Sequence, residues 1–171
     1  RAGRLRSQLP KGISYTHGAF WVRRRAPDGA LADGYEVHNL YAGDGANWSK
    51  IESRLVQDRP LDFTRASTVD DMGVIVPSPQ AQAQILAVID SPTYEALHNP
   101  AYSLVANPWR RKYQNCNNFM LQVIGAGIWG ISDPDEIIAR LKTRYTPTVV
   151  KADAIMRFFG PIADQRLRTD D

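Results

Sequence analysis

The segment from Asn115 to Ile128, where a polar loop passes into an apolar helix, constrains the fold more than any other. Apolar residues recur at i, i+4 spacing after Asn118, which predicts a helix over 116–128 with one face in a core. Asn115 is a suitable N-cap and places the only cysteine, Cys116, in the first turn. We therefore expect the rest of the chain to be organised around the start of this helix.

Two interpretations of Cys116 are open. At a helix start, free N–H groups and the helix dipole favour an anion, so the pKa of the thiol is expected to fall and the thiolate to become a nucleophile. Alternatively, a lone cysteine is simply a small buried apolar residue. The amide-rich surroundings, Gln114 to Asn118, favour the nucleophile.

Composition indicates an ordinary globular chain, with 171 residues, 43% hydrophobic and 23% charged. We expect an N-terminal arm (1–12), one domain (13–164) and a frayed tail (165–171). The net charge of +3 selects no anionic partner, and we expect no nucleic-acid partner. One cysteine excludes an internal disulfide and a multi-cysteine zinc site. We expect no metal and no cofactor.

No apolar window is long enough for a transmembrane segment. The oligomeric state is left open.

Hydrophobic patterns predict an α+β fold around a mostly antiparallel sheet. Strands are expected over 13–22 and 35–41, joined by a hairpin connection, with shorter strands over 61–68 and 72–76. Helices are expected over 80–89 and from Asp133 to about Lys142, with a weak helix over 49–59 and one turn over 93–98. A long loop, 99–115, precedes the cysteine helix, and 149–159 shows no clean period.

Two histidines lie centrally on the first two predicted strands. Cysteine chemistry needs a base for the thiol proton and a group that orients that base. If His17 and His38 oppose each other in a hairpin, their side chains lie about 5 Å apart, and a helix carrying Cys116 completes a Cys-His-His site. Each histidine could instead be a strand residue with a satisfied hydrogen bond. His98, at a helix end, is explained by the helix dipole and is a reserve base.

Four blocks of the chain resemble one bacterial family of uncharacterised proteins, catalogued as domain of unknown function 2145. They are Tyr15-Thr16-His17-Gly18-Ala19-Phe20, Val37-His38-Asn39-Leu40, Val74-Ile75-Val76-Pro77-Ser78-Pro79, and Asn99 to Val105 with Tyr113-Gln114-Asn115-Cys116-Asn117. The resemblance covers nearly the whole chain. It implies an exported protein, periplasmic or secreted. Some members carry serine at the position of Cys116.

A more distant resemblance is to the permuted NlpC-type papain-like superfamily. An early strand histidine followed by a late Asn-Cys helix start is similar to its pattern, and Asn115-Cys116-Asn117-Asn118-Phe119 resembles the Asn-Cys-x-x-Phe motif of the lecithin:retinol acyltransferase group. The resemblance implies a papain-like fold in which the cysteine helix packs on the sheet. It also implies Cys116 as nucleophile, His17 as general base and His38 as the residue that orients His17.

These observations predict a cysteine hydrolase that cleaves amide bonds through a thioester. Its substrate is a peptide or amide, and the resemblance implies a cell-wall (peptidoglycan) peptide. Oxyanion or substrate contacts are expected from Tyr15, Gln114 and Asn115, while Arg110 and Arg111 are expected to bind an anionic or carboxylate group. Two alternatives remain: an acyltransferase or lipase with the same triad, and a non-catalytic binding module on an inactivated papain-like fold.

Overall fold

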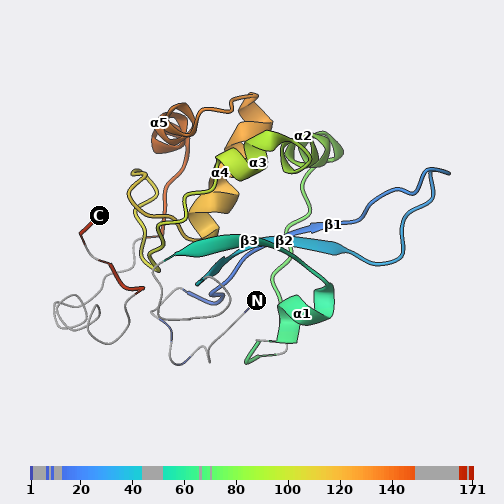
Figure 1. The fold of residues 1–171 in the computed structure, drawn as a ribbon, viewed down its shortest axis with the longest axis horizontal. Coiled ribbons are helices and arrows are strands. Elements are labelled where there is room, and N and C mark those ends of the chain that lie inside the picture. Colours follow the sequence, from blue (N-terminus) through green and yellow to red (C-terminus); the bar gives the residue numbers. More distant parts are fainter. Residues whose placement is uncertain are drawn as a thin grey trace.

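The computed structural model describes residues 1, 7, 9, 13–43, 52–65, 67–69, 71–148, 166–168 and 170–171. Within these residues it is a mixed α+β fold, with one three-stranded antiparallel sheet and five helices (Figure 1). Helices α2, α3, α4 and α5 lie on one side of the sheet and α1 lies on the other. No helix in the described part of the chain is long and apolar enough to cross a membrane.

The sheet has the strand order β1-β2-β3, with β2 in the centre. Strand β1 (Phe20–Val22) pairs with β2 (Glu36–Ala42) so that Phe20 lies opposite His38. Strand β3 (Ser53–Asp58) pairs with the other edge of β2. Successive side chains of β2 alternate between the two faces, so Leu40 packs in the main core while Asn39 and Tyr41 turn towards α1.

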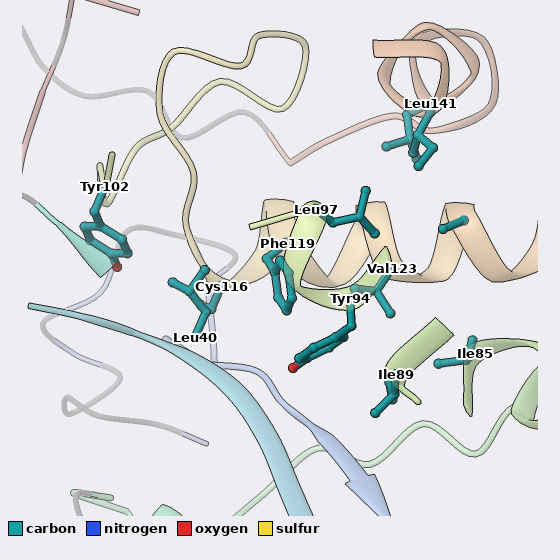
Figure 2. Packing of buried hydrophobic residues seen from close by; sticks show 12 residues of the cluster. Leu40, Ile85, Ile89, Tyr94, Leu97, Tyr102, Cys116, Phe119, Val123 and Leu141 are labelled. Carbon is teal, nitrogen blue, oxygen red and sulfur yellow. The ribbon is translucent and has the colours of Figure 1, made fainter. Parts of the chain in front are cut away.

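Helix α4 (Cys116–Trp129) is the element on which the main core is built. Its N-cap is Asn115, whose side chain accepts a hydrogen bond from the N–H of Asn118. It ends at Gly130, whose φ of 66° is a left-handed cap that glycine adopts without strain. Figure 2 shows Cys116 beside Leu40, at the end of the helix that faces β2.

The remaining helices pack around α4. They are α2 (Pro79–Ile89), with N-cap Ser78, α3 (Pro92–Ala96), with N-cap Ser91, and α5 (Pro134–Arg144), with N-cap Asp133. Each begins with proline in its first turn, where the missing N–H costs nothing. On the opposite face of the sheet, α1 (Pro60–Arg65) contributes the fully buried ring of Phe63. These helices confirm the predictions for 80–89, 93–98, 116–128 and the segment after Asp133.

Three predicted elements are wrong. The segment predicted as a weak helix over 49–59 forms β3 from Ser53, because pairing with β2 outweighs its weak i, i+4 pattern. The strand predicted over 61–68 is instead α1, which Pro60 begins and a first-turn acid, Asp62, favours. Residues 72–76 form neither a strand nor a helix and pair with no strand of the described chain, and Ile75 is 92% exposed.

The first predicted strand is shorter than expected. Only Phe20–Val22 of the predicted 13–22 belong to the sheet, whereas the hairpin partner over 35–41 is confirmed. The backbone N–H groups of Thr16 and His17 are bonded to the carbonyl oxygen of Arg1, at 3.0 and 3.3 Å, instead of to β2. The predicted segment over 149–159 lies outside the described residues.

The described C-terminal residues pack against the loop over 99–115, which differs from the frayed tail that we expected. The Arg168 guanidinium lies 4.5 Å from the centre of the Tyr113 ring, and Asp170 accepts hydrogen bonds from Lys112 and Tyr113. The N–H of Leu104 is bonded to the carbonyl oxygen of Arg166. The loop is therefore held in place by the chain end.

Candidate functional site

Cys116 occupies the first turn of α4, as its N-cap predicts, and is 5% exposed. It belongs to the same buried cluster as Leu40, Tyr102 and Phe119. Gly18 comes close to this turn: a Cβ on Gly18 would lie 2.6 Å from the Met120 sulfur and 3.8 Å from the Asn117 side-chain oxygen. The chain segment after His17 is therefore packed on the start of α4.

Burial raises the pKa of the Cys116 thiol above its ordinary value. The backbone N–H groups of Gly18, Asn117 and Cys116 itself act in the opposite direction, because they stabilise the thiolate. Burial is the larger effect. In this conformation Cys116 is a neutral thiol, which is the reverse of the lowered pKa that the helix start alone predicts.

His17 and Asn39 are hydrogen-bonded, with 3.1 Å between His17 Nε2 and Asn39 Oδ1. The amide of Asn39 is fixed in this orientation, since its Nδ2 donates to the carbonyl oxygen of Val56 at 3.2 Å and to Asp58 Oδ2 at 3.3 Å. The side-chain oxygen that faces His17 can only accept a hydrogen bond. His17 must therefore carry its proton on Nε2.

The other ring nitrogen of His17, Nδ1, has no hydrogen-bond partner among the described residues. Because Nε2 carries the proton, Nδ1 presents a lone pair and can act as a base. Burial, the largest influence, lowers the pKa of His17 from 6.5 to about 4, although the bond to Asn39 raises it. The imidazole is therefore neutral at neutral pH.

Aromatic rings hold the imidazole of His17 on the α1 side of the sheet. It is stacked on the ring of Tyr41, with ring centres 5.0 Å apart and planes 11° apart, and lies 5.5 Å from the ring of Phe63. The Tyr41 hydroxyl donates to Asp58 at 2.7 Å. The position of His17 is thus fixed by two rings and one amide.

His38 does not orient His17, which corrects the predicted Cys-His-His arrangement. Its Nε2 lies 3.2 Å from Glu36 Oε2, and its ring meets the edge of Tyr94 on α3. The physical reason is strand alternation. His17 contacts Asn39 and Tyr41, which lie at odd spacings from His38 along β2 and therefore on the other face of the strand. The two imidazoles therefore lie on opposite faces of the sheet.

The side chains of Gln114 and Asn115 have structural partners. Gln114 is buried: its Nε2 donates to the carbonyl oxygen of Leu97 and to Gln122, both at 2.9 Å, and its Oε1 accepts from the N–H of Asn99. Asn115 caps α4 and donates to the carbonyl oxygen of Leu104. Tyr15 is 40% exposed.

Arg110 and Arg111 are exposed on the loop that precedes α4. Arg111 forms an ion pair with Asp135 of α5, at 3.2 Å, and the Arg110 N–H is bonded to the carbonyl oxygen of Asn107. These contacts tie the loop to the core and to itself. The structure does not bring either guanidinium into contact with Cys116.

Asn39 is the residue that sequence reasoning missed. It stands next to His38 in the sequence, and only the sheet register shows which of the two shares a face with His17. An asparagine in the middle of a strand, in Val37-His38-Asn39-Leu40, was the available signal, because asparagine is uncommon in strands. Among the described residues, no group of three or more potential metal ligands is found.

Comparison with known proteins gives one match. The whole chain, residues 1–171, matches the model of a family described as an uncharacterized protein conserved in bacteria, DUF2145. No curated protein matches, and no solved structure matches.

Proposed function

We propose that this chain, which belongs to the uncharacterised bacterial family DUF2145, is a thiol hydrolase that cleaves amide bonds through a thioester. In this proposal Cys116 is the nucleophile, His17 the general base and Asn39 the residue that orients it, on a permuted papain-like fold. The observation that carries the proposal is that one short segment serves both ends of the site. His17 holds a base whose tautomer Asn39 fixes, and the next residue, Gly18, packs on the first turn of α4, which carries Cys116.

The proposed reaction has two steps. In the first, the Cys116 sulfur attacks the amide carbonyl carbon, and the thiol proton passes to His17 Nδ1 through one water molecule, because no direct hydrogen bond joins the two side chains among the described residues. That proton then passes to the leaving amine as the C–N bond breaks. In the second, His17 takes a proton from water as the hydroxide attacks the thioester carbonyl carbon. The C–S bond then breaks, the acid product is released, and the Cys116 thiolate regains the proton from His17. The backbone N–H of Cys116, in the first turn of α4, is the proposed donor to the oxyanion.

Asn39 supports this assignment better than His38 does. A base in an acyl-transfer site needs one defined tautomer, and an amide oxygen specifies it without adding a charge. The neutral state of His17 at neutral pH leaves Nδ1 able to accept a proton. The fixed tautomer and the neutral state of His17 both follow from residues 17 and 39 and their surroundings, whatever the substrate is.

Mass spectrometry of the intact protein after mixing with p-nitrophenyl acetate tests the proposal. We expect an acetyl group on Cys116 and its loss on incubation. Cys116→Ala should remove it, and His17→Ala and Asn39→Leu should slow acylation at least tenfold. His38→Gln is the matched control, because it changes a histidine on the other face and should acylate within twofold of wild type. Acylation unaffected by His17→Ala would contradict the proposed base.

A binding module on an inactivated papain-like fold is the second candidate. The observation that favours it is the burial of Cys116, which raises the pKa of the thiol and covers the sulfur. The same experiment separates the two candidates, since a binding module predicts no acyl group on Cys116 in any variant.

The proposed substrate is the peptide of the cell wall, and the proposed location is the periplasm or the exterior. Both follow from the resemblance of the chain to exported proteins. Incubation with purified peptidoglycan, followed by chromatography of the released fragments, tests the substrate. New free amines in wild type and none in Cys116→Ala are the expected result.

A further inference from the structure

Arg1 covers the face of the sheet that carries His17. Its carbonyl oxygen accepts hydrogen bonds from the N–H groups of Thr16 and His17, and its N-terminal ammonium group donates to the carbonyl oxygen of His17 at 2.9 Å. These are main-chain hydrogen bonds, of the kind that an extended peptide forms when it binds beside another segment. The carbonyl oxygen of any bound peptide can accept the two N–H groups that the Arg1 carbonyl oxygen accepts.

The side chain of Arg1 lies on the rings that surround His17. Its guanidinium carbon is 4.9 Å from the centre of the Phe63 ring and 5.9 Å from that of Tyr41, which are cation–π distances. A cavity of about 620 Å³ continues past it, and Asp71 lines this cavity. The surroundings therefore suit a cationic side chain: two ring faces with a carboxylate near by.

Arg1 is nevertheless an imperfect occupant. Its Nε and Nη1 are buried and have no hydrogen-bond partner within the described residues. Buried N–H groups without acceptors lose the hydrogen bonds that water would give them. The contact is therefore weaker than the burial of the side chain suggests, which allows another ligand to displace Arg1.

We propose that the space beside His17, where the Arg1 side chain lies on the rings of Phe63 and Tyr41 at the edge of the cavity lined by Asp71, is a subsite for a cationic side chain of a bound peptide, and that Arg1 fills it within the same chain. The ligand class is a peptide with an arginine- or lysine-like side chain. The statement that this peptide is a substrate rests on the proposed hydrolase. The statement that it binds does not rest on that proposal, because none of the subsite residues is the nucleophile.

The test uses calorimetry in the Cys116→Ala background, where turnover is absent. The probes are N-acetyl-arginine amide and its neutral analogue of nearly equal shape, N-acetyl-citrulline amide. The Arg1→Ala variant should bind the arginine probe at least tenfold more tightly than the protein that keeps Arg1. It should also bind the arginine probe at least fivefold more tightly than the citrulline probe.

Arg65→Ala is the matched control. It removes an arginine that lines the same cavity but is exposed, so it should not change the affinity of the arginine probe. Adding Phe63→Leu to Arg1→Ala should weaken the arginine probe at least fivefold and leave the citrulline probe unchanged. Because the two probes are compared on the same protein, a loss of folding affects both equally.

Two results would overturn the subsite: an arginine probe that binds Arg1→Ala no better than it binds the chain with Arg1 present, or equal affinity for the two probes. Failure of the hydrolase looks different. Selective binding of the arginine probe without acylation of Cys116 would leave the subsite standing and remove the proposed chemistry.

Discussion

His17 and Asn39 form the polar pair on which the candidate site depends, with 3.1 Å between Nε2 and Oδ1. Asn39 is 2% exposed, and its side-chain nitrogen is held by the carbonyl oxygen of Val56 and by Asp58. Because the amide cannot turn without losing these bonds, it fixes the imidazole tautomer as well as its position. The pair connects the first segment of the domain to the central strand.

Removing the amide of Asn39 should change the protonation pattern of His17. In Asn39→Leu, of similar volume, Nε2 loses its acceptor and the Nε2–H tautomer loses its preference. ¹⁵N NMR of the imidazole should show one tautomer in wild type and a mixture in the variant. Since buried groups lose partners, we also expect a loss of about 1–3 kcal/mol of unfolding free energy.

Gln57→Leu is the control for this change, because Gln57 is an exposed amide on the neighbouring strand. It should leave the His17 tautomer unaltered and move stability by less than about 0.5 kcal/mol. A single Nε2–H tautomer in both variants would show that Asn39 does not set it.

Stability should fall in acid because of His17. Its pKa is about 4 in the folded protein and 6.5 ordinarily, so between these values the unfolded chain binds a proton that the folded chain does not. Above pH 6.5 His17 is neutral in both states and does not lower the stability of the folded protein. As the pH falls from 6.5 towards 4, the free energy of unfolding decreases. At about 1.4 kcal/mol per pKa unit, the loss is on the order of 3 kcal/mol.

Urea unfolding at pH 7, 5.5 and 4.5 measures this loss. His17→Gln should be less stable at pH 7 but should show a shallower decline with acid. Burial also lowers the pKa of His98, so a smaller decline in the same direction should remain in the variant. Parallel pH profiles for wild type and His17→Gln would exclude His17 as the source.

Gly127 should tolerate a methyl group less well than Gly18. A Cβ at Gly127 would lie 2.9 Å from the carbonyl oxygen of Gln84 in α2, which is backbone and cannot move alone. A Cβ at Gly18 would meet the end of the Met120 side chain, which can turn away. We expect Gly127→Ala to cost about 2–3 kcal/mol.

Thermal unfolding of both glycine variants is the measurement. Gly18→Ala should cost less than Gly127→Ala and should alter the environment of Cys116, seen as a changed rate of iodoacetamide labelling. An equal loss of stability in the two variants would mean that the α2–α4 contact is not the tighter of the two.

Gln114 should prove structural. Gln114→Met keeps the approximate volume but removes bonds to Leu97, Asn99 and Gln122, which tie the loop over 99–115 to α3 and α4. Because two buried groups and one partly buried group lose their partner, we expect a loss of about 2–4 kcal/mol. Gln80→Met, at an exposed position, is the control and should change stability little. Full stability in Gln114→Met, measured by urea unfolding, would return Gln114 to the candidates for an oxyanion donor.

The sequence by itself determined the elements whose signals are local. Asn115 and Asp133 cap α4 and α5 where the pattern predicts, because a cap and its helix lie within a few residues. The hairpin partner over 35–41 and the position of Cys116 in a first turn were predictable for the same reason. Each of these depends on neighbours along the chain.

Only the tertiary structure decided which polar groups meet. Strand β3 and helix α1 replaced the predicted helix and strand, because pairing with β2 and packing of Phe63 depend on residues far away in the sequence. The choice of Asn39 over His38 beside His17 depends on register, where one residue changes the face of the sheet. The thiol pKa followed burial instead of the helix start, because desolvation by the assembled core exceeds the effect of nearby N–H groups.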